Sequence, residues 1–218
     1  MDERIFLAAL PVERRLAQAY APARSRALWL GLFGLDARLG AVVQAAHEPL
    51  LAQIKLAWWR DELAKSPSSR AQGEPLLALL SAWGDQAAGL SALVDGWEVM
   101  LGREPLGHGE LLQIAEARAL ACAGFTVRLD LAAAESEAKR AARGWALAEL
   151  GAALTEPDQR AAALDLIALQ DWHRARLPRE LRPLAVLHGL AERQRGNGPF
   201  IPGPAAGVRA VRLGLLGI

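Results

Sequence analysis

Acidic side chains are the first groups in this chain that could do chemistry. Binding a diphosphate through magnesium needs several converging carboxylates, commonly at positions i and i+4 on one helical face. Candidate carboxylates occur along most of the chain: Asp36, Glu48, Asp61, Glu62, Asp95, Glu98, Glu116, Asp130, Glu149, Asp165 and Asp171. No Asp-x-x-x-Asp pair lies in a clearly apolar helical stretch. The acidic residues therefore predict no metal site.

Other reaction signatures are also missing from the sequence. It contains no glycine-rich phosphate loop, no His-Glu-x-x-His, no Gly-x-Ser-x-Gly and no Cys-x-x-Cys. The histidines are far apart and are expected mostly at helix ends or in loops: His47, His108, His173 and His188. The single cysteine, Cys122, forms no intramolecular disulfide and is expected to be a small buried apolar residue. These residue types assign no catalytic group.

Composition and charge narrow the class of protein. The chain has 218 residues, of which 52% are hydrophobic and 22% charged, which is typical of a globular domain with a substantial core. A net charge of +1 gives no electrostatic case for nucleic acid. The N-terminus lacks a signal-peptide pattern, and no uncharged apolar run approaches the roughly 18 to 20 residues of a membrane span. We expect a cytoplasmic protein, with a peripheral position at the inner membrane face left open.

Hydrophobic spacing predicts helices nearly throughout, since Ala and Leu dominate and no sustained period-2 alternation occurs. Asp85 is expected as a helix N-cap. A helical domain over residues 1–196 and a Pro/Gly-rich tail over 197–218 are predicted, with an irregular stretch "NGPFIPGPAAG" in the tail. Helices are expected over 3–10, from 11 onward, and over 21–48, 49–65, 76–84, 85–102, 110–134, 135–156, 158–175 and 179–196, with loops at 66–75 and 103–109.

Two adjacent tryptophans stand in "AQIKLAWWRDELAKS". Neighbouring helical residues point about 100° apart, so Trp58 and Trp59 cannot share one buried stripe. The spacing of Trp59 with Leu56 and Leu63 predicts that Trp59 packs in the core. A second apolar face, containing Trp58 and Ile54 together with Leu51, is expected to border a cavity.

Two interpretations of this stretch stay open. It either joins the helices of the bundle, or Trp58 contacts a lipid. Arg60 and Asp61 are expected to hold neighbouring helices by hydrogen-bonded pairing, because unpaired charges there would be unfavourable.

The order of segments resembles the squalene and phytoene synthase family. "AYAPARSRALWLGLFGLDARLGAVVQAAHEPLLAQIKLAWWRDEL" resembles its N-terminal signature, with a Tyr-Ala-Pro lead, a Glu-Pro and a Trp-Trp-Arg-Asp. "ALVDGWEVMLGREPLGHGELLQIAEARALACAG" is similar to its middle section, and "AKRAARGWALAELGAAL" to a later helix. The resemblance runs in a consistent order from Tyr20 to Leu187. It implies an all-α, single-domain bundle of the isoprenoid-synthase type with a central cavity.

Departures from the family pattern concern the metal sites that the resemblance implies. Asp36 remains in the first Asp-rich helix, but "ALAELGAALTE" keeps essentially none of the groups of the second. Other residues stand where further family groups are expected: Arg38, Val43, Gln44, Met100, Ile114 and Ala115. Ionising an allylic diphosphate needs strong metal and carboxylate electrostatics, so this loss predicts a protein without ordinary catalysis.

Three functions follow from these observations. The first is a catalytically degenerate member of the family, a pseudoenzyme that binds an isoprenoid lipid or a protein partner. The family's non-enzymatic branch includes a mitochondrial assembly factor for respiratory complex I, and "EPLLAQIKLAWWRDEL" resembles that branch more closely. The second is an active head-to-head prenyl diphosphate synthase, for which Asp36, Asp61 and either Asp95 or Glu98 would converge on magnesium. The third is an unrelated helical interaction domain without a cavity.

Site assignments follow the first of these functions. No catalytic or metal-binding residue is assigned, and magnesium is the expected cofactor only for an active synthase. The candidate substrate-binding residues are Arg24, Trp58, Arg60 and Asp61.

Overall fold

A computed structural model describes residues 3–102, 105–195 and 203–216, and every regular element in these residues is helical. The all-α class predicted from periodicity is therefore confirmed. The α-helices are α1 (Glu3–Ala9), α2 (Val12–Ala19), α3 (Ala23–Gln44), α4 (Pro49–Ala64), α5 (Pro75–Leu79), α6 (Ser91–Val99), α7 (His108–Arg128), α8 (Glu135–Ala153), α9 (Pro157–Leu169), α10 (Arg182–Gln194) and α11 (Pro204–Val211). Short 3-10 segments are η1 (Pro67–Ser69), η2 (Leu80–Leu90), η3 (Ala132–Ala134) and η4 (Arg179–Leu181), and a π-helical turn, η5 (Arg212–Leu216), follows α11.

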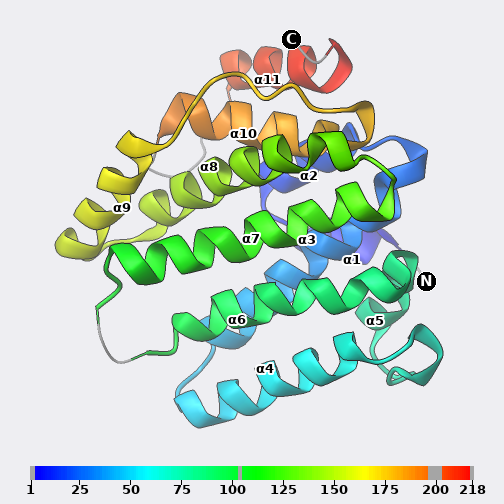
Figure 1. The fold of residues 1–218 in the computed structure, drawn as a ribbon. Helices are drawn as coiled ribbons and strands as arrows, with labels where there is room; N and C mark the ends of the chain where they lie inside the picture. Colours follow the sequence, from blue (N-terminus) through cyan, green and yellow to red (C-terminus); the bar gives the residue numbers. More distant parts are fainter. Residues whose placement is uncertain (1–2, 103–104, 196–202, 217–218) are drawn as a thin grey trace.

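Six helices lie side by side in the order α4, α6, α7, α8, α10 and α11, as Figure 1 shows, and α2 and α3 lie behind them. The sequence explains why α3 is central. It is 22 residues long, and most of its circumference is apolar and buried, from Leu28 through Leu39. A helix that is apolar on nearly all sides must be surrounded by other helices. The fold thus places α3 against the inner faces of its neighbours.

Aromatic rings fill the centre of the main core. The Trp29 ring stacks on Phe125 with 4.0 Å between ring centroids, and Trp83 meets the same Phe125 edge-on at 4.7 Å. The indole N–H groups are satisfied as well, because Trp29 donates to the Glu180 carbonyl and Trp83 to the Leu28 carbonyl. These contacts join α3, η2 and α7 into one core.

α4 lies at one edge of the bundle and packs against α6, α3 and η2. Trp59 is 3% exposed in the core, as its spacing with Leu56 and Leu63 predicts. The opposite face of α4 was expected to border a cavity, and that expectation is wrong. It faces solvent, because an edge helix has neighbours on one side only. Its exposed apolar residues, called here the α4 apolar face, are Leu50, Leu51, Ile54 and Trp58.

Several boundaries differ from the sequence predictions: α3, α7 and α9 end at Gln44, Arg128 and Leu169, earlier than the expected ends at 48, 134 and 175. Asp85 does not cap α6, which begins at Ser91 after η2; the chain bends at Gly84, where φ is +56°. The prediction of an irregular stretch is wrong over residues 204–207, because they belong to α11, which packs on α10 together with η5. Pro204 stands in the first turn, where a fixed φ favours helix initiation. The preceding part of that stretch, residues 197–202, lies outside the described residues.

Two helical segments meet a length and hydropathy criterion for membrane spans, Ala23–Gln44 and Pro75–Val99. The first is α3, whose most apolar window is 56% buried inside the bundle. The second is broken at Gly84. Core helices of soluble proteins meet the same criterion, so these segments are weak evidence for a membrane span.

Candidate functional site

Four charged side chains form a closed ring between four helices. Arg14 of α2 places Nη1 2.7 Å from Asp36 Oδ2 and donates from Nη2 to Glu149 Oε1 at 2.7 Å. Arg118 of α7 bridges the same two carboxylates from the other side, with Nη2 3.2 Å from Asp36 Oδ2 and Nη1 3.3 Å from Glu149 Oε2. Two positive and two negative charges therefore alternate, and the ring is neutral as a whole.

Burial makes this ring unusual. The side chains of Arg14 and Asp36 are each 3% exposed and that of Arg118 is 6% exposed, whereas Glu149 is 30% exposed at the ring's outer edge. Charges removed from water to this extent are tolerated only when each has close partners of opposite sign. The ring supplies two such partners for each charge and so joins α2, α3, α7 and α8.

Aromatic groups complete the surroundings of the ring. The Trp97 indole donates to Asp36 Oδ1 at 2.7 Å, and the guanidinium groups of Arg14 and Arg118 each lie 5.3 Å from the Trp145 ring centroid. Burial by itself would raise the pKa of Asp36. Arg118 and Arg14, together with the Trp97 hydrogen bond, outweigh burial and lower that pKa below its usual range. Asp36 is therefore held as the carboxylate.

The space beside the ring is filled. A small hollow lined by Phe33, Asp36, Arg118, Cys122 and Trp145 has no room for a water-sized sphere. Cys122 is fully buried there, as expected, and burial raises the pKa of its thiol to about 12. The central cavity that the family resemblance implies is not confirmed by this geometry.

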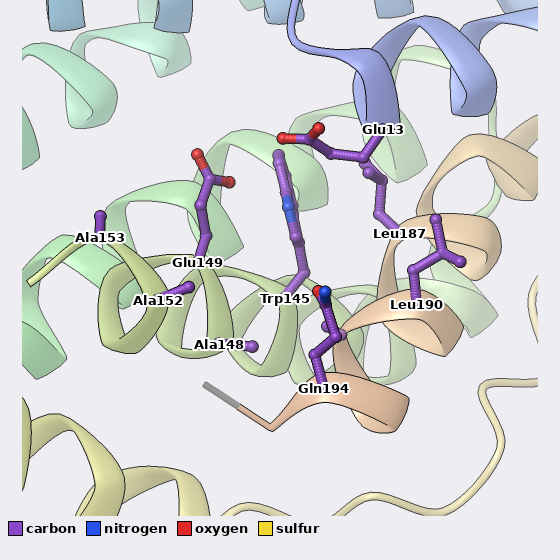
Figure 2. Close-up of a pocket in the computed structure, with 10 residues that line it drawn as sticks. Glu13, Trp145, Ala148, Glu149, Ala152, Ala153, Leu187, Leu190 and Gln194 are labelled. Atoms are coloured by element: carbon purple, nitrogen blue, oxygen red, sulfur yellow. The ribbon is translucent and has the colours of Figure 1, made fainter. Parts of the chain in front are cut away.

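A larger pocket opens on the outer side of the ring, between α2, α8 and α10. Its volume is about 270 Å³. Figure 2 shows the carboxylates of Glu13 and Glu149 on either side of the Trp145 ring, above small and apolar residues such as Ala148 and Leu190. Burial, aided by the nearby charge of Glu149 and opposed by a backbone hydrogen bond, raises the pKa of Glu13. The pocket therefore combines an apolar wall with an acidic rim.

Magnesium does not fit the charged ring. Mg²⁺ requires several oxygen ligands in near-octahedral geometry and is usually held by one or two carboxylates with water and phosphate oxygens. The inward oxygens of Asp36 and Glu149 instead face two guanidinium groups, which already neutralise them. Within residues 3–102, 105–195 and 203–216, no three His, Cys, Asp or Glu side chains are grouped so that they could hold a metal ion.

The predicted substrate-binding residues lie in two different places. Trp58, Arg60 and Asp61 are all on α4, where Trp58 is 37% exposed and Asp61 also faces solvent. Arg60 turns toward α6, so it does join neighbouring helices. Arg24 lies elsewhere, beside the end of α7, where it donates a hydrogen bond to the Leu129 carbonyl at 3.3 Å. The four residues therefore do not share a described pocket.

The carboxylates required by an active synthase do not converge as that alternative predicts. Asp95 and Glu98 share the guanidinium of Arg60, with Nη2 2.6 Å from Asp95 Oδ1 and 2.7 Å from Glu98 Oε2. These two hydrogen bonds raise the pKa of Arg60. Asp61 is exposed, and Asp36 is committed to the buried ring. The set Asp36, Asp61, Asp95 and Glu98 is therefore divided among separate ion pairs and the surface.

Three members of the ring were not identified from sequence: Arg14, Arg118 and Glu149. Asp36 and Arg118 could have been found from the sequence. Asp36 stands in "LFGLDARLG" and Arg118 in "ARALACAG", so each is a charged residue within an apolar helical stretch. Such a charge predicts a buried partner. Arg14 gives no such signal, since "VERRLAQ" reads as an ordinary polar helix.

The stretch "ALAELGAALTE" also contains more of the site than expected. It was expected to keep essentially none of the family groups of the second Asp-rich helix; its Glu149 meets Asp36 through the two arginines. Two helices that the resemblance associates with metal binding thus contribute one carboxylate each to a shared ring.

Comparison of the chain with protein-family models, with curated proteins and with solved structures found no match.

Proposed function

We propose that this chain is a squalene/phytoene synthase-like helical protein that has lost magnesium-dependent catalysis and acts by binding a partner. The observation that carries the proposal is the ring itself. Arg14 and Arg118 stand between Asp36 and Glu149, where a cation-bound diphosphate would need free carboxylate oxygens. A buried guanidinium with two carboxylate partners is strongly held, because removing it from either would leave an uncompensated buried charge.

The α4 apolar face supports a binding role. Leu50, Leu51, Ile54 and Trp58 are between 37% and 66% exposed on one side of a single helix. Contiguous exposed apolar surface of this kind marks interaction sites in soluble proteins. On α4, Arg60 is paired with Asp95 and Glu98, which leaves Lys55 as the exposed basic residue beside the face, and a single lysine attracts an anionic surface only weakly. These features favour a protein partner over an anionic surface, in the manner of an assembly factor.

An activity assay tests the loss of catalysis. Full-length protein is incubated with Mg²⁺ and farnesyl or geranylgeranyl diphosphate, and pyrophosphate release is measured. We expect release no faster than without protein. Release at an enzyme-like rate that disappears in the Glu149→Gln variant would refute the proposal, whereas release unchanged in that variant would come from another source in the preparation.

One observation favours the alternative, an active head-to-head prenyl diphosphate synthase. Glu149 faces both the ring and the pocket, where it stands near Glu13 above an apolar wall. A synthase would have to turn Arg14 away from Glu149 before a metal could bind there. If the protein is such a synthase, Arg14→Gln should increase magnesium-dependent pyrophosphate release, because Glu149 would be free to bind the metal. Our proposal predicts no increase.

A further inference from the structure

Positive charge is concentrated in the C-terminal part of the chain. The whole chain has a net charge of only +1, but residues 171–218 contain eight arginines against the three acidic residues Asp171, Glu180 and Glu192. A local excess of this size, on a protein whose other residues carry a net charge of −4, attracts anionic partners to one region of the surface.

A groove between α10 and the α11–η5 segment gathers four of these arginines. It has a volume of about 370 Å³ and is lined by Arg174, Arg193, Arg209 and Arg212, with Glu192 as its acidic residue. Glu192 is paired with Arg209. Arg174, Arg193 and Arg212 are exposed, and no carboxylate in the described part of the chain forms an ion pair with them. The groove therefore offers three free guanidinium groups.

An apolar stripe runs beside this groove on α11 and η5. Val208, Val211 and Leu215 are 61%, 45% and 67% exposed, and their spacings of three and four residues place them on one side of the segment. Ala210 and Leu213, on the opposite side, are buried against the bundle. The segment is thus amphipathic, with arginines at the border of its exposed apolar side.

The segment is also firmly docked. Its close approach to α10 is possible because Gly189 has no side chain: a Cβ there would lie 2.2 Å from Leu213 Cδ1. A Cβ at Gly214 would lie 2.2 Å from the Tyr20 ring. The stripe and the groove are therefore presented together by the folded domain.

We propose that the groove and the stripe form a docking surface for an anionic phospholipid bilayer. Guanidinium groups bind phosphate oxygens well, and an exposed apolar side flanked by arginines is the pattern of helices that lie in the membrane interface. Nucleic acid or an acidic peptide would satisfy the arginines but leave Val208, Val211 and Leu215 in water. The surface lies at the opposite end of the helix row from α4 (Figure 1). The α4 apolar face would therefore stay accessible to a protein partner while the groove is on a membrane. The inference does not rest on the loss of catalysis.

Vesicle co-sedimentation of the full chain tests this surface. The protein is mixed with vesicles of phosphatidylcholine alone, or with vesicles in which a third of the lipid is phosphatidylglycerol. We expect binding to the second kind only. Since one basic side chain near an anionic surface strengthens binding roughly fivefold, the Arg193→Gln/Arg212→Gln variant should bind about 25-fold more weakly. The matched control, Arg38→Gln/Lys55→Gln, removes one positive charge from α3 and one from α4 and should bind like the original protein.

Further measurements test the apolar stripe apart from the arginines, and distinguish binding to a bilayer from binding by the α4 apolar face or to free phosphate. Val208→Ser/Leu215→Ser should weaken vesicle binding with the arginines intact, while Ile54→Ser/Trp58→Ser on α4 should leave it unchanged. Free glycerol phosphate at the same headgroup concentration should not displace the protein from vesicles. Equal binding to both kinds of vesicle, loss of binding in the α4 variant alone, or displacement by glycerol phosphate would overturn the proposal. Far-ultraviolet circular dichroism confirms that each variant is folded.

Discussion

Arg14 and Asp36 form a buried ion pair, with 2.7 Å between Nη1 and Oδ2 and only 3% of either side chain exposed. The pair belongs to α2 and α3, and Arg118 of α7 approaches the same carboxylate oxygen. Two guanidinium groups thus share this carboxylate, and Glu149 is the second partner of each. Removing the charge of Asp36 would leave two positive charges with one carboxylate between them, so one positive charge would be uncompensated.

The first prediction concerns Asp36. Asp36→Asn should lower the free energy of unfolding by about 3 to 5 kcal/mol, because it leaves an uncompensated charge in the core. Urea denaturation measures this loss. The double variant Asp36→Asn/Arg14→Gln should lose less than the sum of the single variants, since it also removes one unpaired charge. Strict additivity would show that the ion pair contributes nothing.

The adjacent tryptophans of α4 should respond very differently to truncation. Trp59→Ala should lower the free energy of unfolding by about 3 to 5 kcal/mol, as expected for a large side chain removed from the core. Trp58→Ala should cost about 1 kcal/mol or less, mainly the edge-on contact of the two rings at 5.0 Å. Each variant is the control for the other. Equal losses would mean that the α4 apolar face is covered in solution.

Helical periodicity explains why much of the fold could be predicted. Spacing alone placed Trp59 in the core, and the loop at 66–75 was expected from Ser, Pro and Gly. α11 was missed because its Pro and Gly residues indicate a loop, whereas its helix depends on tertiary packing against α10. The ring was missed for the same reason: Arg14 and Glu149 are 135 residues apart, and nothing local to either residue specifies the partner.

The third prediction concerns the docking of α11. Gly189→Ala should loosen the contact of Leu213 with α10 and increase hydrogen exchange of the amides of α11. The Leu213 side chain can partly move away, so the global melting temperature should fall only slightly. Gly203→Ala is the matched control, because nothing lies within 4 Å of the added Cβ. Unchanged exchange in Gly189→Ala would contradict the close packing of this segment.

The fourth prediction is a pH dependence caused by His188. This side chain is 1% exposed, and it stacks on Trp172 with 5.5 Å between centroids. Burial lowers its pKa from 6.5 to about 4, and the positive charges of Arg140, His173 and Arg209 act in the same direction while Glu137 opposes them. The unfolded chain therefore binds the proton more readily. Stability is fully present above the unfolded pKa and declines as pH falls from about 6.5 toward 4, by up to about 3 kcal/mol.

Thermal melts across this pH range measure the effect. His188→Phe keeps an aromatic ring against Trp172 and removes the titrating group, so its melting temperature should fall less between these pH values than that of the original protein. If both proteins lose stability in parallel, other groups cause the decline.

Closure of the bundle centre by Arg14 and Arg118 is the central claim. A crystal structure of the chain soaked with Mg²⁺ and a prenyl diphosphate tests it most directly. The ring should remain intact, with Arg14 bonded to both Asp36 and Glu149 and no diphosphate or metal density between the two carboxylates. Density for a metal-bound diphosphate at that position, with Arg14 displaced, would contradict the claim and identify a working synthase.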